Sequence, residues 1–222
     1  KLVLATGSIP LKPKWLLGGD KENVFVIPKD KIYLDEIKKK LASHKKIVVI
    51  GAGFIGVEFS DELNKSKFDV TLVEKLPDIL SLAFDAELSK KIAEILALRG
   101  VKIKTGNGIK EILGKDKVES VCLENGEIIE ADMVILTVGY KPNVELARNS
   151  GIYIDESGFI AVDEYMRTHV KDIFAVGDCA QKRDFVTRAR VSTMLASTAC
   201  AEARIAGMNL FNLNVVKTFS GT

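Results

Sequence analysis

The middle of the chain alternates between short apolar runs and segments with helical spacing. Residues 47–50 are all apolar, which is typical of a short strand covered on both faces of its sheet. Residues 54–65 have apolar positions at helical spacing, and residues 69–74 have the pattern of a second strand. These three segments predict a βαβ unit of about 30 residues.

The same alternation continues on both sides of this unit. A helix is predicted over residues 32–41, and a second one between the N-cap candidate Asp85 and the stop signal Gly100. Asn125-Gly126 is a strong hairpin signal. Further strands are predicted at residues 2–5, 101–105, 117–124, 127–129 and 133–138, whereas residues 8–24 are rich in Pro and Gly and are expected to be a connecting segment.

The last third of the chain has a different pattern. Strands are expected at residues 152–154 and 159–162 around a turn at 155–158, and a third strand at 173–176. A helix is predicted over residues 192–208. Four alanines recur along it at helical spacing and predict close packing against a flat surface such as the sheet: Ala196, Ala199, Ala203 and Ala206.

A glycine motif follows the first buried strand and opens the next helix. Residues 51–56 are Gly51-Ala52-Gly53-Phe54-Ile55-Gly56, a G-x-G-x-x-G motif in the setting that dinucleotide binding requires. Gly51 permits the tight turn, Gly53 lets the backbone approach a pyrophosphate, and Gly56 allows close packing of helix on strand. The amino end of the helix supplies free N–H groups and a positive dipole end to the phosphates.

An acidic residue ends the second strand. Glu74 lies 74 − 56 = 18 positions beyond the last glycine, where a carboxylate can accept hydrogen bonds from the adenosine ribose hydroxyls. A 2′-phosphate beside this carboxylate would place like charges close together, so we expect NADH to bind better than NADPH. The adjacent Lys75 could soften that repulsion, so the expected preference is not exclusive.

Composition and charge exclude several classes of protein. Among 222 residues, 47% are apolar and 28% are charged, which excludes disorder and fibrous repeats. The 32 basic and 30 acidic residues are mixed along the chain, so no nucleic-acid partner is expected. No apolar run approaches the roughly 18 residues of a membrane span, and we expect a soluble cytoplasmic protein. The chain starts without Met in a strand-like run, and we therefore expect a piece of a longer protein.

The three cysteines suggest neither disulfides nor a metal site. Cys122, Cys179 and Cys200 are scattered, form no Cys-x-x-Cys pair, and are accompanied by only two histidines. We expect each of them to be a small buried residue, and no bound metal.

Four motifs occur in the order found in a known family. They are residues 2–8, 51–58, 137–143 and 173–178. In this order they resemble FAD-dependent pyridine nucleotide-disulfide oxidoreductases, most of all the branch of NADH oxidase, NADH peroxidase and coenzyme A-disulfide reductase. The resemblance implies an α/β fold in which a Rossmann-like NAD-binding domain is inserted in an incomplete FAD-binding domain. Residues 12–143 would form the NAD(H)-binding domain, and residues 1–11 and 144–222 the FAD-domain segments.

The resemblance also implies roles for residues of the FAD segments. Asp178 would bind the ribityl chain of FAD while Gly177 clears space for it; an ordinary strand-ending turn is the alternative. Thr6 and Gly7 would lie near the FAD pyrophosphate at the crossing into the NAD domain, or form a simple turn. Two residues at the start of the last helix would approach the isoalloxazine ring: Leu195 and Ala196.

Three further residues would face the nicotinamide side of the NAD site. Phe54 matches an aromatic gate that covers the flavin until nicotinamide displaces it, although it could equally be a core residue. Glu58 would face the nicotinamide carboxamide, or solvent. Gly139 would line the NAD site, where a side chain would clash with the cofactor.

Departures from the family pattern limit what this chain is expected to do. It has one G-x-G-x-x-G motif, already assigned to NAD, and lacks the upstream redox cysteine and the dimerisation domain that would follow Thr222. We therefore expect it to bind NAD(H) but not to hold FAD, and to contain no catalytic acid, base or nucleophile.

The intact protein would be a homodimer that passes a hydride from NADH to FAD and on to a disulfide, persulfide, peroxide or dioxygen. Its substrate would be a small molecule or a thiol or disulfide. A ferredoxin- or rubredoxin-reductase type of electron-transfer flavoprotein and a non-catalytic NAD(H)-sensing module remain alternatives.

Overall fold

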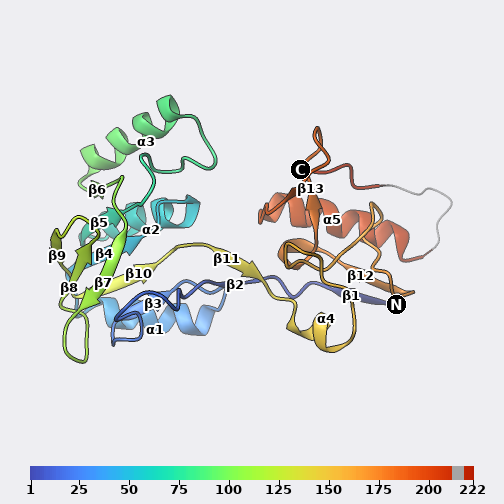
Figure 1. Cartoon of the computed structure of the whole chain (residues 1–222), viewed down its shortest axis with the longest axis horizontal. Coiled ribbons are helices and arrows are strands. Elements are labelled where there is room, and N and C mark those ends of the chain that lie inside the picture. Colours follow the sequence, from blue (N-terminus) through green and yellow to red (C-terminus); the bar gives the residue numbers. More distant parts are fainter. Residues whose placement is uncertain (212–217) are drawn as a thin grey trace. The chain divides into compact units, whose positions relative to one another are not determined.

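The computed structural model describes residues 1–211 and 218–222, which divide into two compact units (Figure 1). Unit A is residues 10–139, and unit B combines residues 1–9 with 140–222.

Unit A is built on a five-stranded sheet in which every pairing is parallel. Its strands, in spatial order, are β3 (Val24–Val26), β10 (Met133–Leu136), β4 (Lys46–Ile50), β5 (Asp69–Val73) and β6 (Lys102–Lys104). The predicted mixed α/β fold with a parallel sheet is confirmed.

Three helices cover one face of this sheet: α1 (Lys31–Leu41), α2 (Phe54–Lys65) and α3 (Ala86–Arg99). Ile37 of α1, Leu63 of α2 and Leu96 of α3 pack with the buried side chains of that face. Asp85 caps α3 by accepting the Leu88 N–H, and Gly100 ends it in the left-handed conformation, as predicted.

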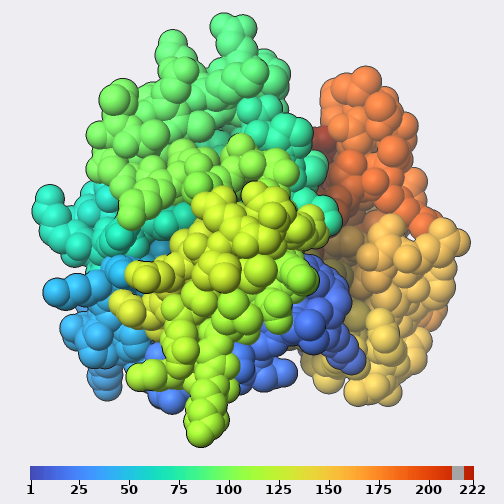
Figure 2. Space-filling model, turned by 60° about the vertical axis from the view of Figure 1, so that its left-hand side comes forward, coloured from blue at the N-terminus to red at the C-terminus, as the bar shows by residue number. Residues whose placement is uncertain are grey.

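An antiparallel meander covers the other face of the sheet. It consists of β7 (Ile109–Leu113), β8 (Ser120–Leu123) and β9 (Ile128–Glu130), and its outer side is the yellow-green surface in Figure 2. The hairpin at Asn125-Gly126 is confirmed, with Gly126 at φ +87°. Strand β8 is shorter than the predicted 117–124, and β7 was not predicted because a register shift between Ile109 and Glu111 interrupts its alternation.

Unit B contains short strand pairs rather than one large sheet. β1 (Leu2–Leu4) runs parallel to β12 (Ile173–Ala175), and β13 (Lys182–Arg183) antiparallel to β14 (Arg190–Val191). β2 (Ser8–Pro10), whose last residue is the first of unit A, pairs with β11 (Tyr140–Pro142). The helical elements are α4 (Glu145–Asn149), the 3-10 turn η1 (Gly177–Cys179) and α5 (Ala196–Asn209). No helix among the described residues has the length and apolar character needed to cross a membrane.

Several element predictions were wrong. The segment 8–24 contains β2 and the first residue of β3, since backbone pairing forms strands too short to leave a pattern in the sequence. Residues 152–154 and 159–162 form a single bridge, Ile154 to Ile160, although the turn between them is confirmed by the Asp155 N–H donating to the Phe159 carbonyl.

Helix predictions were wrong in detail. Helix α5 starts at Ala196 and not at residue 192, because pairing of β14 with β13 keeps the preceding chain extended. Of its alanines, Ala196 and Ala203 are exposed and Ala199 faces the Gly177 turn, whereas Ala206 is buried and packs in a cluster with Phe174 of β12, as predicted. Ile32, which fits the helical spacing of apolar residues over 32–41, is 76% exposed and does not lie on the buried face of α1. Cys200 is also exposed, whereas Cys122 and Cys179 are buried as expected.

Candidate functional site

The glycine turn between β4 and α2 is packed as tightly as its sequence predicts. Gly51 has φ +99°, and a Cβ on it would lie 2.7 Å from the Thr137 carbonyl oxygen. A Cβ on Gly56 would lie 1.9 Å from the Gly51 carbonyl oxygen and 2.7 Å from Thr137 Oγ1. Only glycine fits at these two positions, so α2 approaches β4 and β10 closely.

Gly53 differs from the other two glycines because the space beside it is open. It is exposed, and a Cβ on it would have no atom within 4 Å. It is the N-cap of α2, and no side chain of the described residues caps this helix. The amino end of α2 therefore presents its first N–H groups at an open surface, which is the arrangement that holds a pyrophosphate.

The Glu74 carboxylate lies at the same turn. Its Oε2 accepts the Ala52 N–H at 2.6 Å, and its Oε1 accepts the Leu76 N–H at 2.9 Å. Each carboxylate oxygen has two lone pairs, so both keep accepting capacity for ribose hydroxyls. Lys75 is exposed, and its ammonium lies 3.2 Å from Glu124 Oε1, so it is engaged by a different carboxylate.

The aromatic ring of Phe54 lies at the surface, so the core alternative for this residue is wrong. Phe54 is 47% exposed and meets the ring of Phe84 edge-on, with centroids 5.8 Å apart. The loop that carries Phe84 is attached to the glycine turn by the Leu80 N–H, which donates to the Ala52 carbonyl at 2.8 Å.

The remaining residues predicted to bind NAD are Ile55, Glu58 and Gly139. Ile55 packs against the core of unit A, and Glu58 is exposed on α2. Gly139 has φ +111°, a conformation that L side chains rarely adopt, and its carbonyl accepts the Leu11 N–H at 2.9 Å.

In unit B, the Gly177-Asp178 turn forms η1 at the end of β12. Asp178 is buried, and its Oδ2 accepts the Ser8 hydroxyl at 2.7 Å. Thr6 and Asn143 bind each other: the Thr6 hydroxyl donates to the Asn143 carbonyl, and the Asn143 amide donates to the Thr6 carbonyl. A Cβ on Gly7 would meet no atom within 4 Å.

The start of α5 is open to solvent. Leu195 is the N-cap and is 46% exposed, and Ala196, the first helical residue, is also exposed. No side chain of the described residues caps this helix.

Residues 1–203 match the family model of the pyridine nucleotide-disulphide oxidoreductases. The chain belongs to this family. The predicted resemblance is thereby confirmed, and members of this family use NAD(H) and FAD.

Relatives in the pyridine nucleotide-disulphide oxidoreductase family span more than this chain. The NADH oxidase of Methanocaldococcus jannaschii is 34% identical over 94% of this chain and 46% of its own length. The CoA-dependent NAD(P)H sulfur oxidoreductase of Pyrococcus abyssi is 35% identical over the same shares. The chain thus spans about half the length of the curated relatives it matches.

Solved structures of the family have the same fold. An NAD-dependent persulfide reductase from A. fulgidus matches all of this chain and 40% of its own, with 33% identity and a TM-score of 0.92. A ferredoxin reductase from Rhodopseudomonas palustris matches 99% of this chain and 53% of its own, with 27% identity and a TM-score of 0.90.

Sequence reasoning missed several residues around these family motifs. Phe84 and Ser8 are distant in sequence from Phe54 and Asp178, which they contact, so only the fold identifies them. The buried pair of Lys182 and Glu202 was missed for the same reason. The possible signals were a lysine three residues after the Gly-Asp-Cys turn and a glutamate within an alanine-rich helix.

Proposed function

We propose that unit A binds NADH across the amino end of α2, and that the intact protein is an NADH-dependent flavoprotein oxidoreductase. The observation that carries the proposal is the Glu74 carboxylate, which the Ala52 N–H holds at the rim of the glycine turn. An anion site for the pyrophosphate and an acceptor for the ribose are thereby adjacent.

The residues of the turn bind different parts of the cofactor. Gly51, Gly53 and Gly56 leave room for the backbone of α2 to contact the phosphates, and Glu74 orients the adenosine ribose. The same carboxylate disfavours a 2′-phosphate, so NADH binds more tightly than NADPH.

Phe54, Glu58, Gly139 and Ile55 complete this site in the proposal. Phe54 is the aromatic gate that covers the flavin until nicotinamide displaces it, Glu58 faces the nicotinamide carboxamide, and the edge-on contact of Phe54 with Phe84 limits the positions its ring can take. Gly139 leaves space beside the cofactor, and Ile55 anchors the first turn of α2 in the core.

For unit B we propose the FAD contacts that the family resemblance implies. Asp178 would bind the ribityl chain, and its hydrogen bond from Ser8 would hold its carboxylate in place. Gly177 and Gly7 would leave space for FAD beside the backbone. Thr6 would join the two chain crossings between the domains through its hydrogen bond to Asn143. Leu195 and Ala196 would approach the flavin ring. When bound, FAD accepts the hydride of NADH and passes the electrons on.

The 222-residue chain itself is proposed to bind NAD(H) only. In the intact protein, which we propose to be a cytoplasmic homodimer, the electrons would go to a disulfide, persulfide, peroxide or dioxygen. The name of one relative, CoA-dependent NAD(P)H sulfur oxidoreductase, supports a sulfur compound as the acceptor, and the name NADH oxidase supports NADH as the electron donor. The similarity to a ferredoxin reductase supports a second candidate, electron transfer to a small redox protein.

Titration of this chain with NADH and NADPH tests the proposal. We expect NADH to bind more tightly, and Glu74→Ala or Glu74→Gln to weaken NADH by about 1–3 kcal/mol, the scale of hydrogen bonds to charged groups. Glu62→Ala is the control, because Glu62 is an exposed glutamate on α2, with Lys65 as its partner. Equal affinities for the two nucleotides, or an unchanged Glu74 variant, would refute the ribose assignment.

A further inference from the structure

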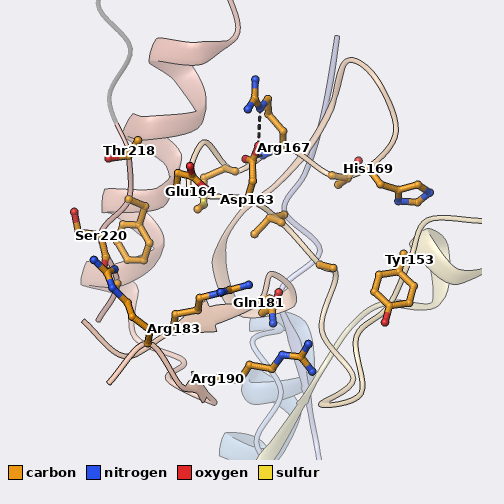
Figure 3. Close-up of a pocket in the computed structure, with 17 residues that line it drawn as sticks. Tyr153, Asp163, Glu164, Arg167, His169, Gln181, Arg183, Arg190, Thr218 and Ser220 are labelled. Carbon is orange, nitrogen blue, oxygen red and sulfur yellow. Dashed lines mark hydrogen bonds and ion pairs between the residues drawn. The ribbon is translucent and has the colours of Figure 1, made fainter. Parts of the chain in front are cut away.

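Residues of unit B line an open cavity of about 850 Å³ that the proposed function does not use (Figure 3). This volume is within the usual range of small-molecule sites, about 300–1,000 Å³. Among the described residues, none of those assigned to FAD lines it. The cavity therefore needs its own explanation.

One wall of the cavity is the β13–β14 hairpin, which brings two like charges together. Arg183 and Arg190 are directly opposite each other in its register. Like charges at directly opposite positions destabilise a strand pair. Glu156 lies 3.1 Å from Arg190 but is 86% exposed, and no ion pair of the described residues involves Arg183, so the repulsion is only weakly compensated.

A buried amide lies beside the two guanidinium groups. Gln181 precedes Arg183 by two positions, so in an extended segment its side chain lies on the same face. Figure 3 shows these two side chains and Arg190 gathered in one part of the cavity. Gln181 is only 7% exposed, and its Nε2 has no hydrogen-bond partner among the described residues. A buried donor without an acceptor costs about 1–3 kcal/mol.

The remaining charges leave the cavity positive. Arg167 binds Asp163 at 2.7 Å, and Arg188 donates to the Ser220 carbonyl. Among the described residues, four arginines line the cavity against two carboxylates, those of Asp163 and Glu164. The buried Gln181 amide, which lacks an acceptor, is a hydrogen-bond donor, and most of the charge that lines the cavity is positive.

We propose that this cavity is a binding site for a phosphate group, held by Gln181, Arg183 and Arg190. A guanidinium matches the geometry of phosphate oxygens in a bidentate contact. A phosphate dianion would relieve the repulsion between the two arginines and give the Gln181 amide an acceptor. The volume of the cavity leaves room for the rest of an organic phosphate.

Inorganic phosphate is the probe for a test on the whole chain. Its affinity is measured by calorimetry at constant ionic strength, with chloride as the balancing anion. We expect saturable binding to the wild type, weakened about tenfold or more in Arg183→Gln. Arg148→Gln is the control, since Arg148 is an exposed arginine of the same unit on α4, outside the cavity, and it should bind phosphate like the wild type.

A second measurement separates a binding site from a structural role. Without phosphate, Arg183→Gln should raise the melting temperature, because it removes one of two facing charges; a structural role for Arg183 predicts a fall. The proposal is overturned if phosphate does not bind, if Arg183→Gln binds it as well as the wild type, or if this variant melts at a lower temperature without phosphate. Because NADH binding is measured separately, these outcomes do not depend on the nucleotide site.

Discussion

At the scale of single residues, the Gly177 turn is held by a buried ion pair. The Glu202 Oε2 accepts the Gly177 N–H at 2.6 Å, and the Lys182 ammonium donates to the Gly177 carbonyl at 2.7 Å. Both side chains are 0% exposed, and Lys182 Nζ lies 3.4 Å from Glu202 Oε1. The pair thus binds both polar backbone atoms of the residue that precedes Asp178.

Burial raises the pKa of Glu202, and the charge of Lys182 opposes this shift. Since a raised pKa in the folded state disfavours the ionised form, stability falls as the pH rises above the ordinary value of 4.5. We predict that Lys182→Met removes the compensating charge and costs about 3–5 kcal/mol near pH 8, but less near pH 4. Urea unfolding across this pH range measures the difference.

A double variant provides the control for this prediction. In Lys182→Met/Glu202→Gln the neutral amide can still accept the Gly177 N–H, and no buried charge remains. The pH dependence of the Lys182→Met penalty should therefore disappear. A penalty that is equal at pH 4 and pH 8 in the single variant would contradict the assignment of Glu202 as the titrating group.

At the scale of elements, two glycines at the amino end of α2 have different roles, one in folding and the other in binding. A Cβ at position 56 collides with backbone, whereas a Cβ at position 53 enters open space. We predict that Gly56→Ala destabilises unit A severely, and that Gly53→Ala costs only about 1 kcal/mol, the scale of a poor N-cap, while weakening NADH binding by tenfold or more. Thermal unfolding and NADH titration of both variants distinguish the two effects. A Gly53→Ala variant with wild-type affinity would place the pyrophosphate elsewhere.

The elements that sequence reasoning found are those whose signals are local. The glycine turn, the Asp85 cap, the Gly100 stop and the Asn125-Gly126 hairpin each depend on backbone chemistry within a few residues. The elements it missed, such as β3 and β7, are short or irregular and exist because a partner strand lies beside them. The same limit applies to the candidate site: Glu74 was found by spacing, but its contact with Ala52 and the Phe54–Phe84 pair required the fold.

At the scale of the whole molecule, each buried hydrophobic cluster belongs to one of the two units. Two buried clusters contain residues of unit A alone, and the other two contain residues of unit B alone. Each unit thus has buried clusters of its own among the described residues and can gain stability from its own ligand.

This separation predicts a local response to NADH. A ligand that binds only the folded state stabilises it by about 2.7 kcal/mol at a concentration of 100 times Kd. We predict that saturating NADH slows amide hydrogen exchange in peptides of residues 10–139, most of all around the glycine turn, and leaves residues 1–9 and 140–222 unchanged. Hydrogen exchange with mass spectrometry on the intact chain measures this, with the Glu74→Ala variant at the same NADH concentration as the control. Equal protection of both units would mean that binding energy passes between them, and the units would then have to be treated as one cooperative structure.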